Sequence, residues 1–140
     1  MKVFLLALGF IAVSAASAQD SWKVLLNGKA VLSASTENEE KNRITVKASD
    51  LKKKQDFQVI YTEQPKEKGW DRTIMAVAEN DHELSRQETG KFKIKNALLE
   101  SFFKKSKTIR IYTVSLPADP AKRAVIRVRR VHLCTLVLKS

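Results

Sequence analysis

The chain has 140 residues, of which 44% are hydrophobic and 29% are charged, and this length suits one domain that buries a core by packing alone. Its single cysteine, Cys134, excludes an intramolecular disulfide and therefore a disulfide-stapled secreted scaffold. The formal net charge is +11, and residues 91–140 carry the excess, because they hold 13 basic and only two acidic residues.

The first 18 residues have the pattern of a secretory signal peptide. A lysine at position 2 precedes an apolar run over 3–13, and Ala16-Ser17-Ala18 forms an A-x-A-like cleavage site. The apolar run is shorter than the roughly 20 residues that cross a membrane, and no later stretch is apolar enough to span a bilayer. We expect cleavage after Ala18, a mature domain over 19–140, and a secreted or periplasmic location.

The mature chain begins with a pattern typical of a β-hairpin. Two apolar segments, 22–26 and 29–32, flank Asn27-Gly28, which favours a type I′ turn because both central residues must adopt positive φ. Residues 33–42 are polar and acidic and predict a loop. Residues 43–48 alternate between polar and apolar, as in a strand with one buried face.

The middle of the chain predicts two strands of different kinds. A turn over 49–54 leads into 57–62, which alternates, whereas 73–78 is apolar on both faces, as expected of a central strand. The polar stretches 64–69 and 79–90 predict loops, the second with room for a helical turn.

The last third predicts strands around one helix. Residues 91–95 alternate, and 108–116 is rich in β-formers. Asn96 is expected to cap a short helix over 97–105, with its leucines and phenylalanines toward the core. After a proline-containing turn, 124–138 is the longest β-prone run.

This last run changes its alternation near Arg129-Arg130. In a regular strand one face carries Ala124, Ile126 and Val128, and the other carries Val131, Leu133 and Val137. A β-bulge near Arg129-Arg130 would turn both sets inward. A bend that carries the strand between two sheets would have the same effect.

About eight strands and one short helix, without βαβ alternation, predict an all-β fold: an antiparallel β-sandwich, immunoglobulin-like or jelly-roll rather than a closed barrel. The expected core residues are Trp22, Ile44, Val46, Phe57, Val59, Tyr61, Met75, Val77, Ile109, Ile111, Ile126 and Val128.

The signal peptide, the Trp22 hairpin and the terminal run from Arg127 to Cys134 also carry a family resemblance. With these features the chain resembles small secreted β-sandwich proteins of Gram-negative bacteria. The resemblance implies no site residues. The sequence has no possible intramolecular disulfide and no N-x-S/T glycosylation sequon, which favours the periplasm or outer surface of a Gram-negative cell.

His132 and Cys134 are the one pair that suggests nucleophilic catalysis. They share a face in a regular strand, and a thiol beside an imidazole is the smallest nucleophile pair. Their spacing of roughly 6–7 Å is too long for a direct hydrogen bond. Free cysteine is also among the most buried residue types, so we expect Cys134 in the core without a catalytic role.

Other candidate sites have ordinary explanations. Asp81-His82-Glu83 offers metal-binding groups, but adjacent residues rarely point at one ion, and the sequence lacks zinc-ligand spacing. Asp50 and Asp56 offer paired carboxylates, but both adjoin turns, where aspartate is common. With no nucleophile elbow or phosphate-binding glycine loop, no catalytic residue, metal or cofactor is predicted.

The functional prediction is a basic sheet face near the C-terminus. If the strands containing 91–95, 108–116 and 124–130 lie in one sheet, its outer surface carries Lys91, Lys93, Lys95, Arg110, Tyr112, Arg127 and Arg129. Such a patch attracts an anionic partner, such as lipopolysaccharide, an acidic glycan or an acidic protein, whereas nucleic acid is less expected outside the cell. Alternatively, the cations only keep the face soluble and discourage aggregation.

Two functions fit these observations. The first is a non-enzymatic binding or assembly module of the cell envelope. The second is a small secreted hydrolase or inhibitor acting on envelope polymers or proteins, since β-sandwich hydrolases assemble their sites from residues distant in sequence.

Overall fold

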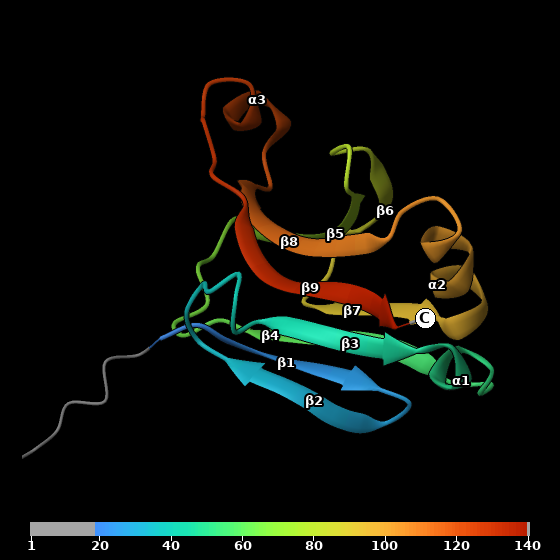
Figure 1. Ribbon diagram of the computed structural model, residues 1–140. Coiled ribbons are helices and arrows are strands. Elements are labelled where there is room, and N and C mark those ends of the chain that lie inside the picture. Colours follow the sequence, from blue (N-terminus) through green and yellow to red (C-terminus); the bar gives the residue numbers. More distant parts are fainter. Residues whose placement is uncertain (1–18, 140) are drawn as a thin grey trace, which may run out of the picture.

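The computed structural model describes residues 19–139, which form nine strands and three short helices in two packed sheets (Figure 1). The all-β sandwich predicted from the alternation is therefore confirmed. Within these residues no helix combines the length and apolar character needed to cross a bilayer. The expected signal peptide, residues 1–18, lies outside the described residues.

One sheet has four antiparallel strands. Its order is β2 (Lys29–Ala34), β1 (Ser21–Leu26), β4 (Asp56–Thr62) and β7 (Lys91–Lys95). Buried and exposed residues alternate along β1 and β7, so one face of this sheet lies on the core and the other faces outward.

The predicted hairpin at Asn27-Gly28 is confirmed. Leu26 pairs with Lys29 across a two-residue turn, and Asn27 and Gly28 have φ values of 54° and 76°. Positive φ at both positions is the geometry of a type I′ turn, whose twist matches that of the flanking strands.

The second sheet has five strands, in the order β3 (Arg43–Lys47), β9 (Val131–Lys139), β8 (Thr108–Pro117), β5 (Trp70–Ala78) and β6 (Glu83–Gln87). The β3–β9 pair is parallel, and the other pairs are antiparallel. Strand β5 is buried on both faces from position 73 to 78, as its apolar run predicted.

The helices are α1 (Ala48–Leu51), α2 (Asn96–Phe103) and α3 (Pro120–Arg123). The predicted cap on α2 is wrong, because the Asn96 side chain turns inward and Lys95 occupies the cap position. Leu98, expected in the core, is 46% exposed, because the buried stripe of this helix runs through positions 99, 102 and 103.

Two strand boundaries differ from the prediction. The stretch 79–90, which the sequence predicted to be a loop, contains β6. This polar strand pairs with β5 and forms one edge of the five-stranded sheet. Conversely, 124–130 lies outside every described strand, and β9 begins at Val131. The β-propensity of the residues did not identify these boundaries, because a segment forms a strand only where a neighbouring strand is available to pair with it.

A bulge does interrupt the last strand, but at Leu133 rather than near Arg129-Arg130. On β8, Ile111 pairs with Cys134 and the next residue, Tyr112, pairs with His132, which leaves Leu133 without a partner. The carbonyl oxygen of Leu133 instead accepts a hydrogen bond from Nε1 of Trp22 on the opposite sheet, at 3.0 Å. The bulge therefore supplies a polar bond between the two sheets.

Most of the expected core is confirmed. The main cluster contains Trp22, Ile44, Val46, Phe57, Val59, Ile109 and Ile111. Met75 and Val77 are buried on the outer face of β5, away from the main cluster, and Tyr61 is half-buried. Ile126 and Val128 are not core residues: they are 37% and 38% exposed, because their segment joins neither sheet.

Candidate functional site

The seven residues of the predicted basic face do not share one surface. The three lysines lie on β7 in the four-stranded sheet, whereas Arg110 and Tyr112 lie on β8 in the five-stranded sheet. Arg127 and Arg129 lie in the segment 124–130, outside both sheets. The expected single face is therefore wrong, because α2 carries the chain from one sheet to the other between β7 and β8 (Figure 1).

The lysines of β7 nevertheless form a basic surface of their own, which also includes Lys23. On the outer side of the four-stranded sheet, Lys23 pairs with Ile60, which in turn pairs with Lys91. Lys93 forms an ion pair with Asp56 at 3.2 Å. We call this surface the lysine face, and its members are Lys23, Lys91, Lys93 and Lys95.

A shallow hollow of about 530 Å³ adjoins the lysine face at Lys23. Hydroxyl side chains line much of it, because Ser21 pairs with Thr62 and Ser33 pairs with Lys23 across neighbouring strands. Hydroxyls both donate and accept hydrogen bonds, so the hollow places neutral polar groups beside a row of cations.

The second candidate site lies on the outer side of the five-stranded sheet. Met75 and Val77 of β5 and Val114 and Leu116 of β8 form its apolar floor, and the segment 124–130 forms one wall. The hollow has a volume of about 470 Å³, and we call it the outer groove. Figure 1 shows α3 and the following segment rising from the sheet opposite β6.

Two arginines meet near the groove. Arg130, which lines it, donates to Oδ1 of Asp81 at 2.6 Å, and Arg110 approaches the same oxygen at 3.4 Å. Arg110 also donates to the hydroxyl of Tyr112 at 3.1 Å, and the guanidinium of Arg130 lies 4.1 Å from the centre of the Tyr112 ring. The hydrogen bond from Arg130 lowers the pKa of Asp81 below its ordinary value. Two cations therefore share one carboxylate.

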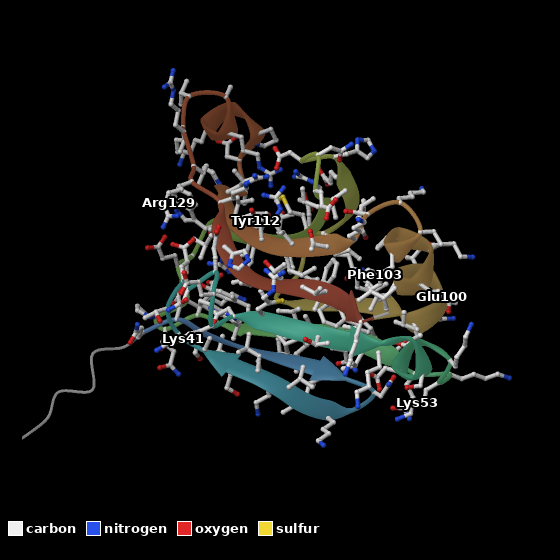
Figure 2. All side chains as sticks on the ribbon, viewed as in Figure 1. Lys41, Lys53, Glu100, Phe103, Tyr112 and Arg129 are labelled. Carbon is white, nitrogen blue, oxygen red and sulfur yellow. The ribbon has the colours of Figure 1, made fainter. Side chains whose placement is uncertain are left out.

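His132 lies beside Tyr112 on this outer side (Figure 2 labels Tyr112), with the two rings edge to face and their centroids 5.6 Å apart. Its Nε2 lies 2.8 Å from the hydroxyl oxygen of Thr135, and its buried Nδ1 has no hydrogen-bond partner among the described residues. Burial lowers the pKa of His132 below 6.5, which favours the neutral ring at pH 7.

Arg129 is engaged elsewhere. Its guanidinium donates to both carboxylate oxygens of Glu37, at 2.6 and 3.1 Å, and Glu37 also accepts from the backbone N–H of His132. The hydrogen bond from Arg129 holds the pKa of Glu37 below its ordinary value. These hydrogen bonds to Glu37 connect the start of β9 to the loop after β2.

The bulge also separates the pair that suggested nucleophilic catalysis. Cys134 packs in the core between the sheets, whereas His132 contacts Tyr112 on the outer side. The expectation that they share a face is therefore wrong, because one extra residue reverses the alternation. Burial raises the pKa of the Cys134 thiol, which keeps it protonated and unreactive.

Cys134 should therefore resist thiol reagents while the protein is folded. We expect labelling by an aromatic disulfide reagent to be slow in buffer and to become fast in denaturant, because the side chain is fully buried. The absorbance of the released thiol measures the rate. Labelling in buffer as fast as in denaturant would contradict the burial.

The acidic candidates have other partners. Asp81 forms ion pairs with Arg110 and Arg130. Within residues 19–139, no three histidine, cysteine or acidic side chains lie close enough together to hold a metal ion. Asp50 accepts a hydrogen bond from the backbone N–H of Lys47, whereas Asp56 pairs with Lys93, so the two carboxylates serve separate contacts.

Sequence reasoning missed Lys23 and the outer groove. The alternation of Trp22, Lys23 and Val24 already pointed Lys23 outward, but which strands would flank it was unknown. The groove joins residues from three separate regions, which no local pattern connects. No family model, curated protein or solved structure matches the chain.

Proposed function

We propose that the protein is a secreted, non-enzymatic binding module of the cell envelope that recognises an acidic glycan through the lysine face. One observation carries the proposal: the lysine face holds four lysines, and the four strands of its sheet contain a single acidic residue, Asp56. A surface of one sign concentrates polyanions near it and speeds their association.

The arrangement of the lysine face suits an extended polymer. Lys91, Lys93 and Lys95 follow one another along β7 at intervals of roughly 7 Å, and Lys23 lies two strands away, roughly 10 Å from Lys91. Several separated charges on an acidic chain can therefore each meet a cation. A single small anion would engage only one or two of them.

The hydroxyl-lined hollow supports a sugar polymer over other polyanions. Sugars present many hydroxyls, and Ser21, Ser33 and Thr62 offer matching donors and acceptors beside Lys23. The hollow lies beside Lys23, so a chain that crosses β4 from Lys91 to Lys23 would reach it.

The test is binding to immobilised polygalacturonate, a polymer of acidic sugars, across a series of salt concentrations. We expect the variant Lys23→Ser/Lys91→Ser/Lys95→Ser to bind about tenfold more weakly at low salt, because exposed ion pairs contribute up to about 1 kcal/mol each. Its affinity should also depend less on salt, since fewer counterions are displaced.

A matched control removes the same charge from another surface. Lys104→Ser/Lys105→Ser/Lys107→Ser takes three exposed lysines from the end of α2 and the loop that follows it. This variant should bind like the wild type if position matters. Equal weakening in both variants would show that net charge alone drives binding and would overturn the proposal. Preference for vesicles containing lipopolysaccharide over polygalacturonate would overturn the choice of a glycan.

A further inference from the structure

We infer that the outer groove is a second binding site, for an amphiphile with a carboxylate head and an acyl chain. This site lies on the opposite sheet from the lysine face and does not depend on the function proposed for that face. The inference rests on an apolar floor, an overhanging apolar wall and two arginines with one carboxylate between them.

The apolar surface that the floor offers to a ligand comes from Val114 and Leu116, which are half-buried. Met75 and Val77 belong to a small cluster with Tyr112 and Val114, separate from the main core. This cluster lies on the outer side of β5 and β8, where Met75, Val77 and Tyr112 are each at most 6% exposed and therefore already covered. The volume of the groove, about 470 Å³, lies within the range of a few hundred Å³ that is typical of ligand sites.

The wall explains why an apolar run lies outside the sheets. In the segment 124–130, Ile126 and Val128 line the groove, whereas Val125 is 82% exposed and does not. Alternating side chains therefore present one apolar edge to the groove, as they would in a strand. An acyl chain lying between this edge and the half-buried Val114 and Leu116 would remove apolar surface from water.

The arginines supply the head-group contact. Arg110 and Arg130 both approach Asp81, so the three groups carry a net charge of +1. Arg110 does not line the groove and also donates to the Ala78 carbonyl at 3.1 Å, so Arg130 is the arginine of this cluster that a ligand in the groove would meet. A ligand carboxylate beside Arg130 would balance the charge.

A second ion pair, between Arg86 and Glu83 of β6, also lines the groove. Arg86 donates to both carboxylate oxygens of Glu83, at 2.6 and 3.2 Å, on the far side of the apolar floor. Because Glu83 balances the charge of Arg86, this pair adds no net charge to the groove. The uncompensated cation lies at the Arg130 end, which sets the direction of the bound amphiphile.

The experiment is titration calorimetry of the full mature chain with dodecanoate, kept below the concentration at which it forms micelles. Dodecanol and acetate serve as the tail-only and head-only probes. We expect saturable binding of dodecanoate with one site, at least about tenfold weaker binding of dodecanol, and no detectable binding of acetate. Equal binding of dodecanol and dodecanoate would overturn the head-group assignment.

Two pairs of variants locate the site. Ile126→Asp places a charge against the acyl chain, and Val125→Asp places the same charge one residue away, outside the groove. Arg130→Ser removes the proposed head-group contact, and Arg127→Ser removes an arginine of the same segment that does not line the groove. The groove variants should weaken dodecanoate binding at least about tenfold, and the two controls less than about twofold.

The inference has outcomes that separate it from the glycan proposal. The Lys23→Ser/Lys91→Ser/Lys95→Ser variant should bind dodecanoate like the wild type, because the two sites lie on different sheets. If Arg130→Ser lowers the melting temperature, Ile126→Asp still tests the site, since Ile126 lies outside every described strand and helix. No saturable binding of dodecanoate by the wild type, or equal weakening by groove and control variants, would overturn the inference.

Discussion

Replacing Trp22 by alanine is expected to lower the free energy of unfolding by about 3–5 kcal/mol, the usual cost of removing a large aromatic side chain from a core. The Trp22 side chain lies between the sheets, stacks on Tyr61 with ring centroids 6.0 Å apart, and donates to the carbonyl of Leu133. Its loss leaves a cavity and an unpaired carbonyl at the bulge. Urea unfolding followed by circular dichroism measures the change.

A smaller substitution separates the hydrogen bond from the packing. Trp22→Phe keeps an aromatic ring but leaves the Leu133 carbonyl without its donor, which should cost about 1–3 kcal/mol. Trp70→Phe is the matched control, because Trp70 is half-buried at the end of β5 and should change the free energy by about 0.5 kcal/mol or less. Equal effects of the two phenylalanine variants would contradict the inter-sheet hydrogen bond.

Replacing Asn96 by alanine is expected to cost about 2–3 kcal/mol, because the Lys53 carbonyl and Oδ1 of Asn27 would lose the hydrogen bonds that Asn96 donates. The two N–H groups of the Asn96 side chain are shared among three acceptors, the carbonyls of Asp50 and Lys53 and Oδ1 of Asn27, which lie 2.6–3.1 Å from Nδ2. It therefore joins the first hairpin, the turn after α1 and the start of α2. Chemical denaturation again gives the free energy of unfolding.

Two further variants test whether Asn96 acts as a donor. Asn96→Asp keeps the shape but replaces the amide by an acceptor facing two carbonyls, so it should be at least as destabilising as Asn96→Ala. Asn27→Gly preserves the positive φ of the turn and removes one partner, so its effect should be smaller. Wild-type stability of Asn96→Asp would show that the donated hydrogen bonds contribute little.

The predicted basic face shows what the alternation of polar and apolar residues along a strand can predict and what it cannot. The outward direction of Lys91, Lys93 and Lys95 on their strand, and of Arg110 and Tyr112 on theirs, followed from the two-residue period of a strand. That period carries no information on which strands become neighbours. The lysines therefore lie on one sheet and Arg110 and Tyr112 on the other, whereas Arg127 and Arg129 lie outside both sheets.

The last β-prone run, residues 124–138, shows the same limit of prediction from local sequence. Its β-propensity predicted one long strand with either a bulge or a bend near Arg129-Arg130, whereas the structure has a bulge at Leu133. A bulge occurs where the partner strand and the opposite sheet satisfy the freed backbone groups, and here Trp22 supplies that bond from 111 residues away. No local signal marks a partner so distant.

By itself the sequence determined what depends on neighbouring residues: the type I′ turn at Asn27-Gly28, the alternating strands, the doubly buried β5 and the all-β class. Only the tertiary structure decided the division of the strands between two sheets, the separation of His132 from Cys134, and the groove beneath the segment 124–130. The reason is physical. Turn geometry and side-chain alternation are set within a few residues, whereas strand pairing and cavities are set by contacts between segments that the sequence alone does not bring together.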